Sequence, residues 1–267
     1  MAALKVLRHA LLRLLVLSLV ALAGVQFYFV ARIALMAVIA PESTAFERSE
    51  IYRITKTTRV LPWRQQWTPY AKISVNLQRA VIASEDASFT EHDGLDLEAL
   101  EKAWEKNAVA ERRAQKIAEQ QAAQAARQGK KPAAAVAQSP AAKPVKIVGG
   151  STITQQLAKN LFLSGERTLL RKGQELVLTL LLETLLDKQR ILEIYLNSVE
   201  WGEGIFGAEA AAQHYFRKPA ARLSPYEAAR LAVMLPRPRY FETRPNSDYL
   251  ATRANAIVAR MGSVDLP

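Results

Sequence analysis

The sequence predicts a mostly α-helical protein, one compact domain preceded by an N-terminal transmembrane helix. Three observations predict this. An uncharged apolar run occupies residues 14–31, apolar residues recur at helical spacing in most segments after residue 73, and no segment alternates convincingly as a strand. Half of the 267 residues are hydrophobic, which is enough for a substantial core. We expect residues 1–40 to form a cytoplasmic tip and anchor, and residues 41–267 to form the domain.

The anchor is predicted from length and flanking charge. The run from Leu14 to Ala31 would span roughly 27 Å as a helix, close to the ~30 Å hydrocarbon thickness of a bilayer. Lys5, Arg8 and Arg13 precede it, so the N-terminus is expected in the cytoplasm and the domain on the outer side. Ala21-Leu22-Ala23 resembles a signal-peptidase site, which makes a cleaved signal peptide the alternative. We favour an uncleaved anchor because the apolar character continues to residue 40.

The first part of the domain is expected to be irregular and then helical. Residues 41–75 are mixed, and Trp63 and Trp67 are either interfacial aromatics or core contacts. Residues 73–85 have helical spacing, and the helix leads into a polar stretch with a stop at Gly94. Asp96 is expected to cap a helix that continues through Trp104.

Residues 107–147 change in character and are interpreted as an insertion within the domain. This segment is rich in Ala, Gln and Lys and has no aromatic residue. It cannot bury enough apolar surface to offset its ordering entropy, so we expect a polar helix over 107–127 and a mobile loop beyond it.

Gly149–Asn160 supports two interpretations. One is an N-capped amphipathic helix, with Ser151 as cap and Leu157 and Leu161 facing inward. The other is a ligand site, because hydroxyls, amides and Lys159 follow a Gly pair in quick succession.

The C-terminal half is expected to be helical throughout. Residues 171–186 are apolar nearly all round, which predicts a buried central helix. The glycines at 202, 204 and 207 indicate a turn-rich loop. Further helices are predicted over 188–197, 208–216, 224–235 and 248–261, the third with Ser224 as cap, Pro225 at its first position and Pro236 and Pro238 ending it.

Composition excludes several kinds of chemistry. There is no cysteine, so disulfides and thiolate sites are excluded. Three histidines, His9, His92 and His214, are too few to favour a His-based metal cluster or a Ser-His-Asp triad. The net charge of +11 comes mainly from residues 1–40, with +4, and residues 107–147, with +6. No nucleic-acid recognition motif accompanies that charge, so we expect no nucleic-acid partner.

Glu85 is the first candidate for chemistry. It follows an apolar helix, and burial would raise its pKa and suit it to general acid or base catalysis. The alternative is a surface glutamate, although a negative charge at a helix C-terminus opposes the helix dipole. If the helix persists, Glu85, Phe89 and His92 share one face, with His92 a structural hydrogen-bonding residue rather than a catalyst.

A charged cluster is the second candidate. Arg171 and Lys172 precede Glu175 by four and three residues, so the three side chains meet on one helix. They form either an exposed ion pair worth a few tenths of a kcal/mol or a phosphate-binding group, with Glu175 orienting the cations or sharing a divalent metal. Lys159 is a third cation for such a site.

Together these residues resemble the peptidoglycan glycosyltransferase family. The chain carries, in the family's order, Glu85-Asp86-x-x-Phe89-x-x-His92-x-Gly94, Gly150-Ser151-Thr152-x-Thr154-Gln155-Gln156-x-x-Lys159-Asn160, Arg171-Lys172-x-x-Glu175 and Ile191-Leu192-Glu193-x-Tyr195-Leu196-Asn197. The resemblance covers roughly residues 50–262 and is to the membrane-anchored monofunctional type, because the chain leaves no room for a transpeptidase domain.

The resemblance implies a lysozyme-like fold and a lipid-linked disaccharide-pentapeptide substrate. An acceptor sugar hydroxyl would attack C1 of the growing chain, form a β-1,4 bond with inversion and release undecaprenyl pyrophosphate. Glu85 would be the general base and Glu175 would assist at the donor site. The implied substrate-binding positions are Asp86, Phe89, His92, Gly94, Ser151, Thr152, Gln155, Gln156, Lys159, Asn160, Arg171 and Lys172.

The resemblance also implies a divalent cation (Mg or Mn), with Glu175 as its candidate ligand. It places the chain in a bacterial inner membrane, single-pass, with a periplasmic catalytic domain, and names cell-wall synthesis or division proteins as partners. The long segment between the first two motifs departs from the family, and we expect it to be passive rather than lipid-binding. The rival functions are a lysozyme-like hydrolase or lytic transglycosylase and a membrane-anchored scaffold without activity.

Overall fold

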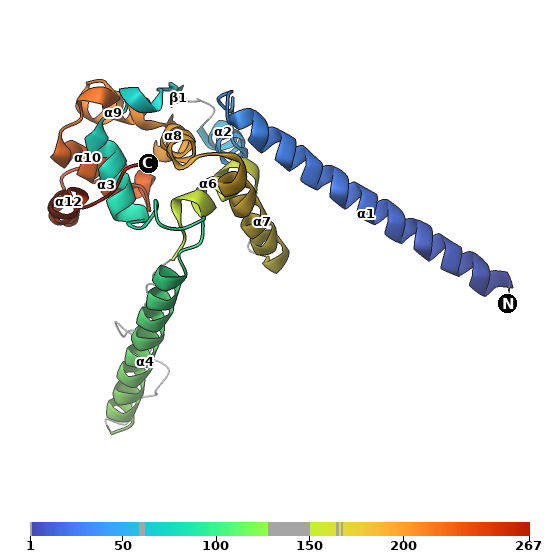
Figure 1. The fold of residues 1–267 in the computed structure, drawn as a ribbon. Coiled ribbons are helices and arrows are strands. Elements are labelled where there is room, and N and C mark those ends of the chain that lie inside the picture. The colour runs from blue at the N-terminus through green and yellow to red at the C-terminus, as the bar shows by residue number, and fades with distance from the viewer. Residues whose placement is uncertain (1, 59–61, 128–149, 164–165, 167) are drawn as a thin grey trace. The chain divides into compact units, whose positions relative to one another are not determined.

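The computed structural model describes residues 2–58, 62–127, 150–163, 166 and 168–267. The chain divides into two compact units, one of Met1–Gly94 with Thr152–Pro267 and the other of Leu95–Ser151. Helices dominate both units, which confirms the mostly α class (Figure 1). The two units are described in turn.

The N-terminal helix α1 spans Ala2–Met36 without interruption (Figure 1). Its segment Lys5–Met36 contains an 18-residue window with a mean hydropathy of 2.3, and the segment is long and apolar enough to cross a membrane. Its C-terminal end is part of the domain, because Ile33 and Met36 are buried in the core. The anchor therefore continues directly into the folded domain.

The segment expected to be irregular contains a helix, α2, over Ala45–Thr58, so that prediction was wrong. Thr44 and Glu47 bond reciprocally: the Glu47 carboxylate accepts from the Thr44 N–H, and the Thr44 hydroxyl accepts from the Glu47 N–H. This Thr-x-x-Glu capping box was visible in the sequence. Trp63 stacks on Phe206 with ring centroids 4.5 Å apart, which identifies it as a domain contact.

One group of helices in the core of the larger unit is α3 (Val75–Glu85), α10 (Pro225–Met234) and α12 (Asp248–Met261), packed side by side (Figure 1). Their buried faces carry aliphatic residues that include Leu77, Val81 and Leu231. Ser224 caps α10 in a capping box with Glu227, and Pro225 opens the helix, as predicted. This packing fixes α3, whose last residue is Glu85.

A second group of helices is α6 (Ile153–Phe162), α7 (Leu169–Leu185) and α8 (Lys188–Ser198). Leu157 and Leu161 face inward on α6 as predicted, but the cap is Thr152 rather than Ser151. Thr152 forms a capping box with Gln155, which only a residue three positions before a Gln can do.

Helix α7 is not the buried central helix that its composition predicted. Leu178 and Leu182 are buried, whereas Leu176, Val177 and Leu180 are 41%, 41% and 46% exposed. Its inner face packs on α6 and α1, and Gln174 exchanges hydrogen bonds with Gln26 of α1 at 3.1 and 3.5 Å. The prediction failed because an apolar helix surface does not by itself say whether protein covers it.

Short strands are present, contrary to expectation. β1 (Arg64–Gln65) pairs parallel with β3 (Ile205–Phe206), which pairs antiparallel with β2 (Glu200–Gly202). Strands of two or three residues are too short to show alternation. The remaining elements of this unit are α9 (Ala208–Phe216), α11 (Pro238–Glu242) and the 3₁₀ turns η1 (Tyr70–Lys72) and η3 (Ala220–Arg222).

The described part of the smaller unit is mainly α4, which spans Leu97–Arg127. The Asp96 side chain accepts a hydrogen bond from the Ala99 N–H at 2.7 Å, so Asp96 caps this helix as predicted. The polar helix expected over 107–127 is continuous with the predicted helix before it. The loop expected beyond residue 127 lies outside the described residues.

Candidate active site

Glu85 is the last residue of α3, and the helix does not continue past it. Asp86 leaves helical geometry, with φ −164° and ψ 75°, so Glu85, Phe89 and His92 do not share a helical face. The Glu85 carboxylate is half-buried and accepts a hydrogen bond from Gln156 Nε2 at 3.0 Å. Burial raises the pKa of Glu85, the hydrogen bonds from Gln156 and Ser84 oppose that rise, and the Asp86 charge adds to it.

Gln156 is held from its other side by Tyr195 of α8. The Tyr195 hydroxyl donates to Gln156 Oε1 at 3.0 Å. Tyr195 is only 1% exposed, and burial is the largest cause that raises its pKa well above the usual value. Its hydroxyl therefore stays protonated, and Gln156 lies between a phenol and a carboxylate.

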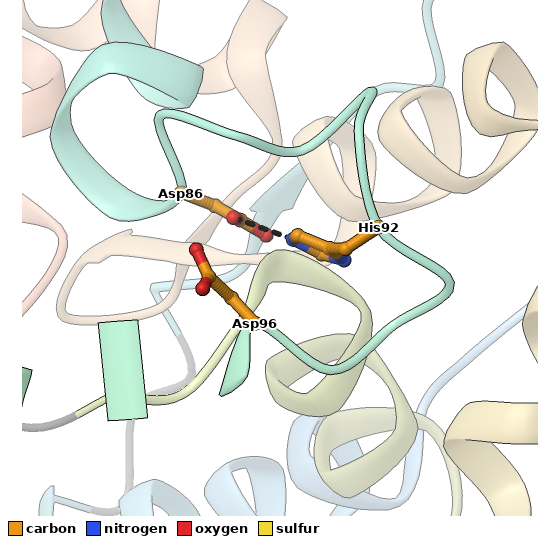
Figure 2. A group of neighbouring side chains, drawn as sticks. All are labelled: Asp86, His92 and Asp96. Carbon is orange, nitrogen blue, oxygen red and sulfur yellow. Dashed lines mark hydrogen bonds and ion pairs between the residues drawn. The ribbon is translucent and has the colours of Figure 1, made fainter. Parts of the chain in front are cut away.

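The loop after Glu85 is tied to the start of α6 through Asp86. Its Oδ2 accepts from the Ile153 N–H at 2.9 Å, a favourable place for a carboxylate at a helix N-terminus. Its Oδ1 lies 2.8 Å from His92 Nε2 (Figure 2). Because His92 Nδ1 accepts from the Gly94 N–H at 3.1 Å, the ring proton is on Nε2 and points to Asp86. These contacts agree with the structural hydrogen-bonding role proposed for His92 from the sequence, and that role stays a prediction.

Gly94 closes this loop in a conformation that favours glycine, with φ +84°. A Cβ there would lie 2.7 Å from Thr179 Cγ2 and 2.9 Å from Glu183 Cγ. Its carbonyl accepts from the Thr152 hydroxyl at 2.7 Å. This hydrogen bond fixes the position of the loop relative to the N-terminus of α6.

The predicted cations gather around Glu175. Arg171 lies 3.3 Å from one Glu175 oxygen, Lys172 contacts the other, and the Glu175 side chain is buried. Desolvation lowers the pKa of Lys159, and Glu175 opposes that shift. The nearby Arg171 and Lys172 charges lower the pKa further. The Lys159 side chain itself is exposed to solvent. Three cations with one carboxylate form a site suited to an anion of high charge.

The same residues do not fit a protein-built metal site. In the described part of the chain, Glu175 belongs to no group of three acidic or histidine side chains whose atoms could share an ion. Its oxygens already face Arg171 and Lys172. Asp86 and His92 are residue types that bind divalent cations. Both Asp86 oxygens, however, accept hydrogen bonds from within the chain.

The remaining predicted residues occupy supporting positions. Phe89 is fully buried, and the Lys188 ammonium lies 4.6 Å from its ring centroid. Gln155 is half-buried and completes the α6 capping box, and Asn160 is half-buried on α6. Ser151 is exposed at the end of the smaller unit.

Sequence reasoning missed a link formed by Thr154, Glu183 and Lys188. The Thr154 hydroxyl donates to Glu183 Oε1 at 2.6 Å, and the Lys188 ammonium lies 2.9 Å from the same oxygen. Lys188 also donates to the His92 carbonyl. A carboxylate within an otherwise apolar helix was the available signal, because such a residue is seldom buried without a partner.

Comparison with known proteins identifies a family that matches this chain and relatives that are about half identical to it. The profile of the transglycosylase family matches residues 53–135 and 128–262. A biosynthetic peptidoglycan transglycosylase of Burkholderia thailandensis is 51% identical over 242 residues, which cover 91% of this chain and 82% of that protein. A protein of the same name from Burkholderia pseudomallei is 48% identical over 242 residues, with the same coverage of both chains.

Proposed function

This chain belongs to the transglycosylase family, and from that premise we propose how it polymerises the glycan strands of peptidoglycan. Its substrate is a lipid-linked disaccharide-pentapeptide. The acceptor sugar 4-hydroxyl attacks C1 of the growing chain, which is the donor and leaves its undecaprenyl pyrophosphate. The product is a β-1,4 bond with inverted configuration at C1. Glu85 is the general base.

The observation that carries this proposal is the pairing of one carboxyl group of raised pKa with a separate cluster of cations. Glu85 contacts α6 through Gln156, and Lys159 lies three residues further along the same helix. A displacement that expels pyrophosphate needs a base at the nucleophile and positive charge at the leaving group. Helix α6 contributes to both, through Gln156 at the base and Lys159 at the leaving group.

The proposed reaction follows from these positions. Glu85 accepts the proton of the acceptor hydroxyl while the oxygen forms its bond to C1. The bond from C1 to the pyrophosphate oxygen breaks, and its electrons go to the leaving group. Lys159, Arg171 and Lys172 stabilise that charge, and Glu175 orients Arg171 and Lys172 through the ion pairs it forms with them.

A divalent cation has no step in this proposal. The residues around Glu175 supply one carboxylate and three cations, which favours an anion over a metal ion. A cation such as Mg or Mn, which the family resemblance implies, would supply further charge neutralisation at the pyrophosphate.

The membrane location is supported by α1 and α7. The apolar anchor contacts α7 through Gln26 and Gln174, and α7 also exposes the apolar residues Leu176, Val177 and Leu180. We propose a single-pass protein of the bacterial inner membrane, with its catalytic domain in the periplasm, where lipid-linked substrate reaches the site along the bilayer. Partners in cell-wall synthesis or division stay a prediction.

The rival is a hydrolase or lytic transglycosylase that uses Glu85 on finished glycan. Such an enzyme needs a catalytic acid but has no leaving pyrophosphate, so it would not require the Lys159, Arg171 and Lys172 group. The cation cluster therefore favours polymerisation.

The two activities are separated by supplying each substrate to the full-length protein in detergent. With lipid-linked disaccharide we expect polymer and released undecaprenyl pyrophosphate. With preformed glycan strands we expect no shortening. Cleavage of the strands without polymer formation would overturn the proposal in favour of the rival. A protein that shows neither polymerisation nor cleavage would also overturn it and would favour the scaffold.

A further inference from the structure

We propose that Tyr195 is a positioning residue for the reaction: its buried hydroxyl orients the Gln156 amide so that the amide NH₂ faces the Glu85 carboxylate. This inference rests on the proposed function of Glu85 as base. Tyr195 touches neither Glu85 nor substrate in this role, because it acts through Gln156.

Gln156 makes two hydrogen bonds, one at each end of its amide. Its Oε1 accepts from Tyr195 at 3.0 Å, and its Nε2 donates to Glu85 at 3.0 Å. A phenol hydroxyl has one proton, and a carboxylate only accepts. With the Tyr195 hydroxyl donating, the amide oxygen must face α8 and the NH₂ group must face Glu85.

The position of Tyr195 makes it a suitable fixed point. It is 1% exposed on α8, between the buried residues Ile194 and Leu196, so its ring has little freedom to move. Gln156, by contrast, is only half-buried, and a free amide can rotate. Without the Tyr195 hydroxyl, the rotated amide would present its oxygen to the Glu85 carboxylate, and two acceptors would face each other.

Other groups around Glu85 do not set the amide orientation. Asp86 is the charged residue next to Glu85 in the chain. Its two carboxylate oxygens accept hydrogen bonds from His92 and from the Ile153 N–H. From α12, Arg260 donates to the Ala83 carbonyl at 3.2 Å in the same helical turn as Glu85. Replacing Tyr195 by phenylalanine leaves all of these groups in place.

The test is Tyr195→Phe in the full-length protein, assayed by polymer formation from lipid-linked disaccharide. We expect kcat to fall about tenfold, the scale of one lost hydrogen bond that serves a charged group, with KM nearly unchanged. The hydrogen bond from Gln156 lowers the pKa of Glu85, so its loss raises that pKa. Because the base acts when deprotonated, the acidic limb of the pH profile should move to higher pH.

A double-mutant cycle separates this role from a structural one. On a Gln156→Ala background, Tyr195→Phe should have almost no further effect, because its only route to Glu85 has been removed. Tyr215→Phe is the matched control: Tyr215 is half-buried, and its hydroxyl donates to the Trp201 carbonyl at 2.7 Å. It should leave kcat and the pH profile unchanged. A Tyr195→Phe loss that is additive with Gln156→Ala, or that comes without the shift of the acidic limb, would overturn the inference.

A second replacement keeps the test valid if Tyr195→Phe folds poorly. Tyrosine fluorinated beside its hydroxyl keeps the ring and donates more strongly, so the acidic limb should move to lower pH. An unchanged profile would count against the inference. Failure of the proposed function is distinguishable, because the wild-type protein would then make no polymer, whereas failure of this inference leaves an active, Glu85-dependent polymerase.

Discussion

At the scale of single residues, Glu85 and Lys159 have opposite shifts that suit opposite tasks. Burial raises the pKa of the Glu85 carboxyl. Desolvation and two neighbouring cations lower the pKa of the exposed Lys159 ammonium, and Glu175 opposes that shift. A raised pKa makes a carboxylate a better proton acceptor. Cations placed close together repel one another, and a bound anion relieves that repulsion. Both shifts are therefore consistent with a site that takes a proton and receives a pyrophosphate.

The pH dependence of kcat/KM follows from these two groups. Glu85 must be deprotonated, so activity is lost as pH falls through its raised pKa. Lys159 must be protonated, so activity is lost as pH rises through its lowered pKa, and the profile is a bell narrower than unshifted groups would give. Lys159→Arg should move the alkaline limb to higher pH. An alkaline limb that does not move would exclude Lys159 as its source.

Removing the Lys159 charge tests the leaving-group role directly. Lys159→Ala should lower kcat about 100-fold, the scale for one lost stabiliser of transition-state charge. Polymerisation is measured with saturating lipid-linked substrate, and Lys56→Ala, an exposed lysine of α2, is the control. A Lys159→Ala enzyme with normal kcat would remove this residue from the proposed reaction.

At the scale of elements, the sequence predicted α3, α8, α9, α10 and α12 because each combines a clear apolar stripe with caps or breakers. It did not predict the strands, which are too short for a pattern, or the exposed face of α7, which depends on what covers it. The motifs predicted Glu85 and the cation cluster. The link from Tyr195 to Glu85 joins three helices, so spacing along the chain could not reveal it.

Helix α2, which packs against α6, offers a test of an element that carries no candidate site residue itself. Thr44→Ala removes the hydroxyl half of its capping box and should cost about 1 kcal/mol of unfolding free energy. The expected fall in Tm is about 2–4 °C for a protein of this size, read by circular dichroism in detergent. Ser43→Ala, which removes a hydroxyl outside the box, should leave Tm nearly unchanged. An equal effect of both replacements would contradict the assignment of the cap.

At the scale of the whole molecule, the anchor is a structural part of the larger unit. The end of α1 buries Ile33 and Met36 in the core, and Arg190 of α8 donates to the Met36 carbonyl at 2.7 Å. The ring of Phe29 meets that of Phe162 edge to face, with centroids 5.3 Å apart. The apolar helix α1 and the helices that carry the candidate site residues therefore share one core.

This shared core predicts that Ile33→Ala destabilises the catalytic domain. The side chain is 0% exposed, so its truncation should cost about 2–5 kcal/mol. Leu17→Ala, at an exposed position of the same helix, should change little. Limited proteolysis of both variants in detergent gives the comparison, and equal resistance would show that the anchor is only a tether.

The segment 107–147 makes a separate prediction. Apart from Ser151, every candidate site residue lies in the unit that excludes Leu95–Ser151. We expect deletion of residues 110–144 to preserve polymerisation in detergent. Collapse of folding in the deletion variant would show that this segment belongs to the core of the protein.

The central claim is that Glu85 is the base of a glycan polymerase. Glu85→Gln keeps the size of the side chain and removes its basicity, and Glu91→Gln changes an exposed glutamate of the neighbouring loop as control. The measurement is polymer and undecaprenyl pyrophosphate formed from lipid-linked disaccharide by each full-length protein. We expect both products to disappear for Glu85→Gln and to persist for Glu91→Gln. Polymer made by Glu85→Gln at the wild-type rate would contradict it.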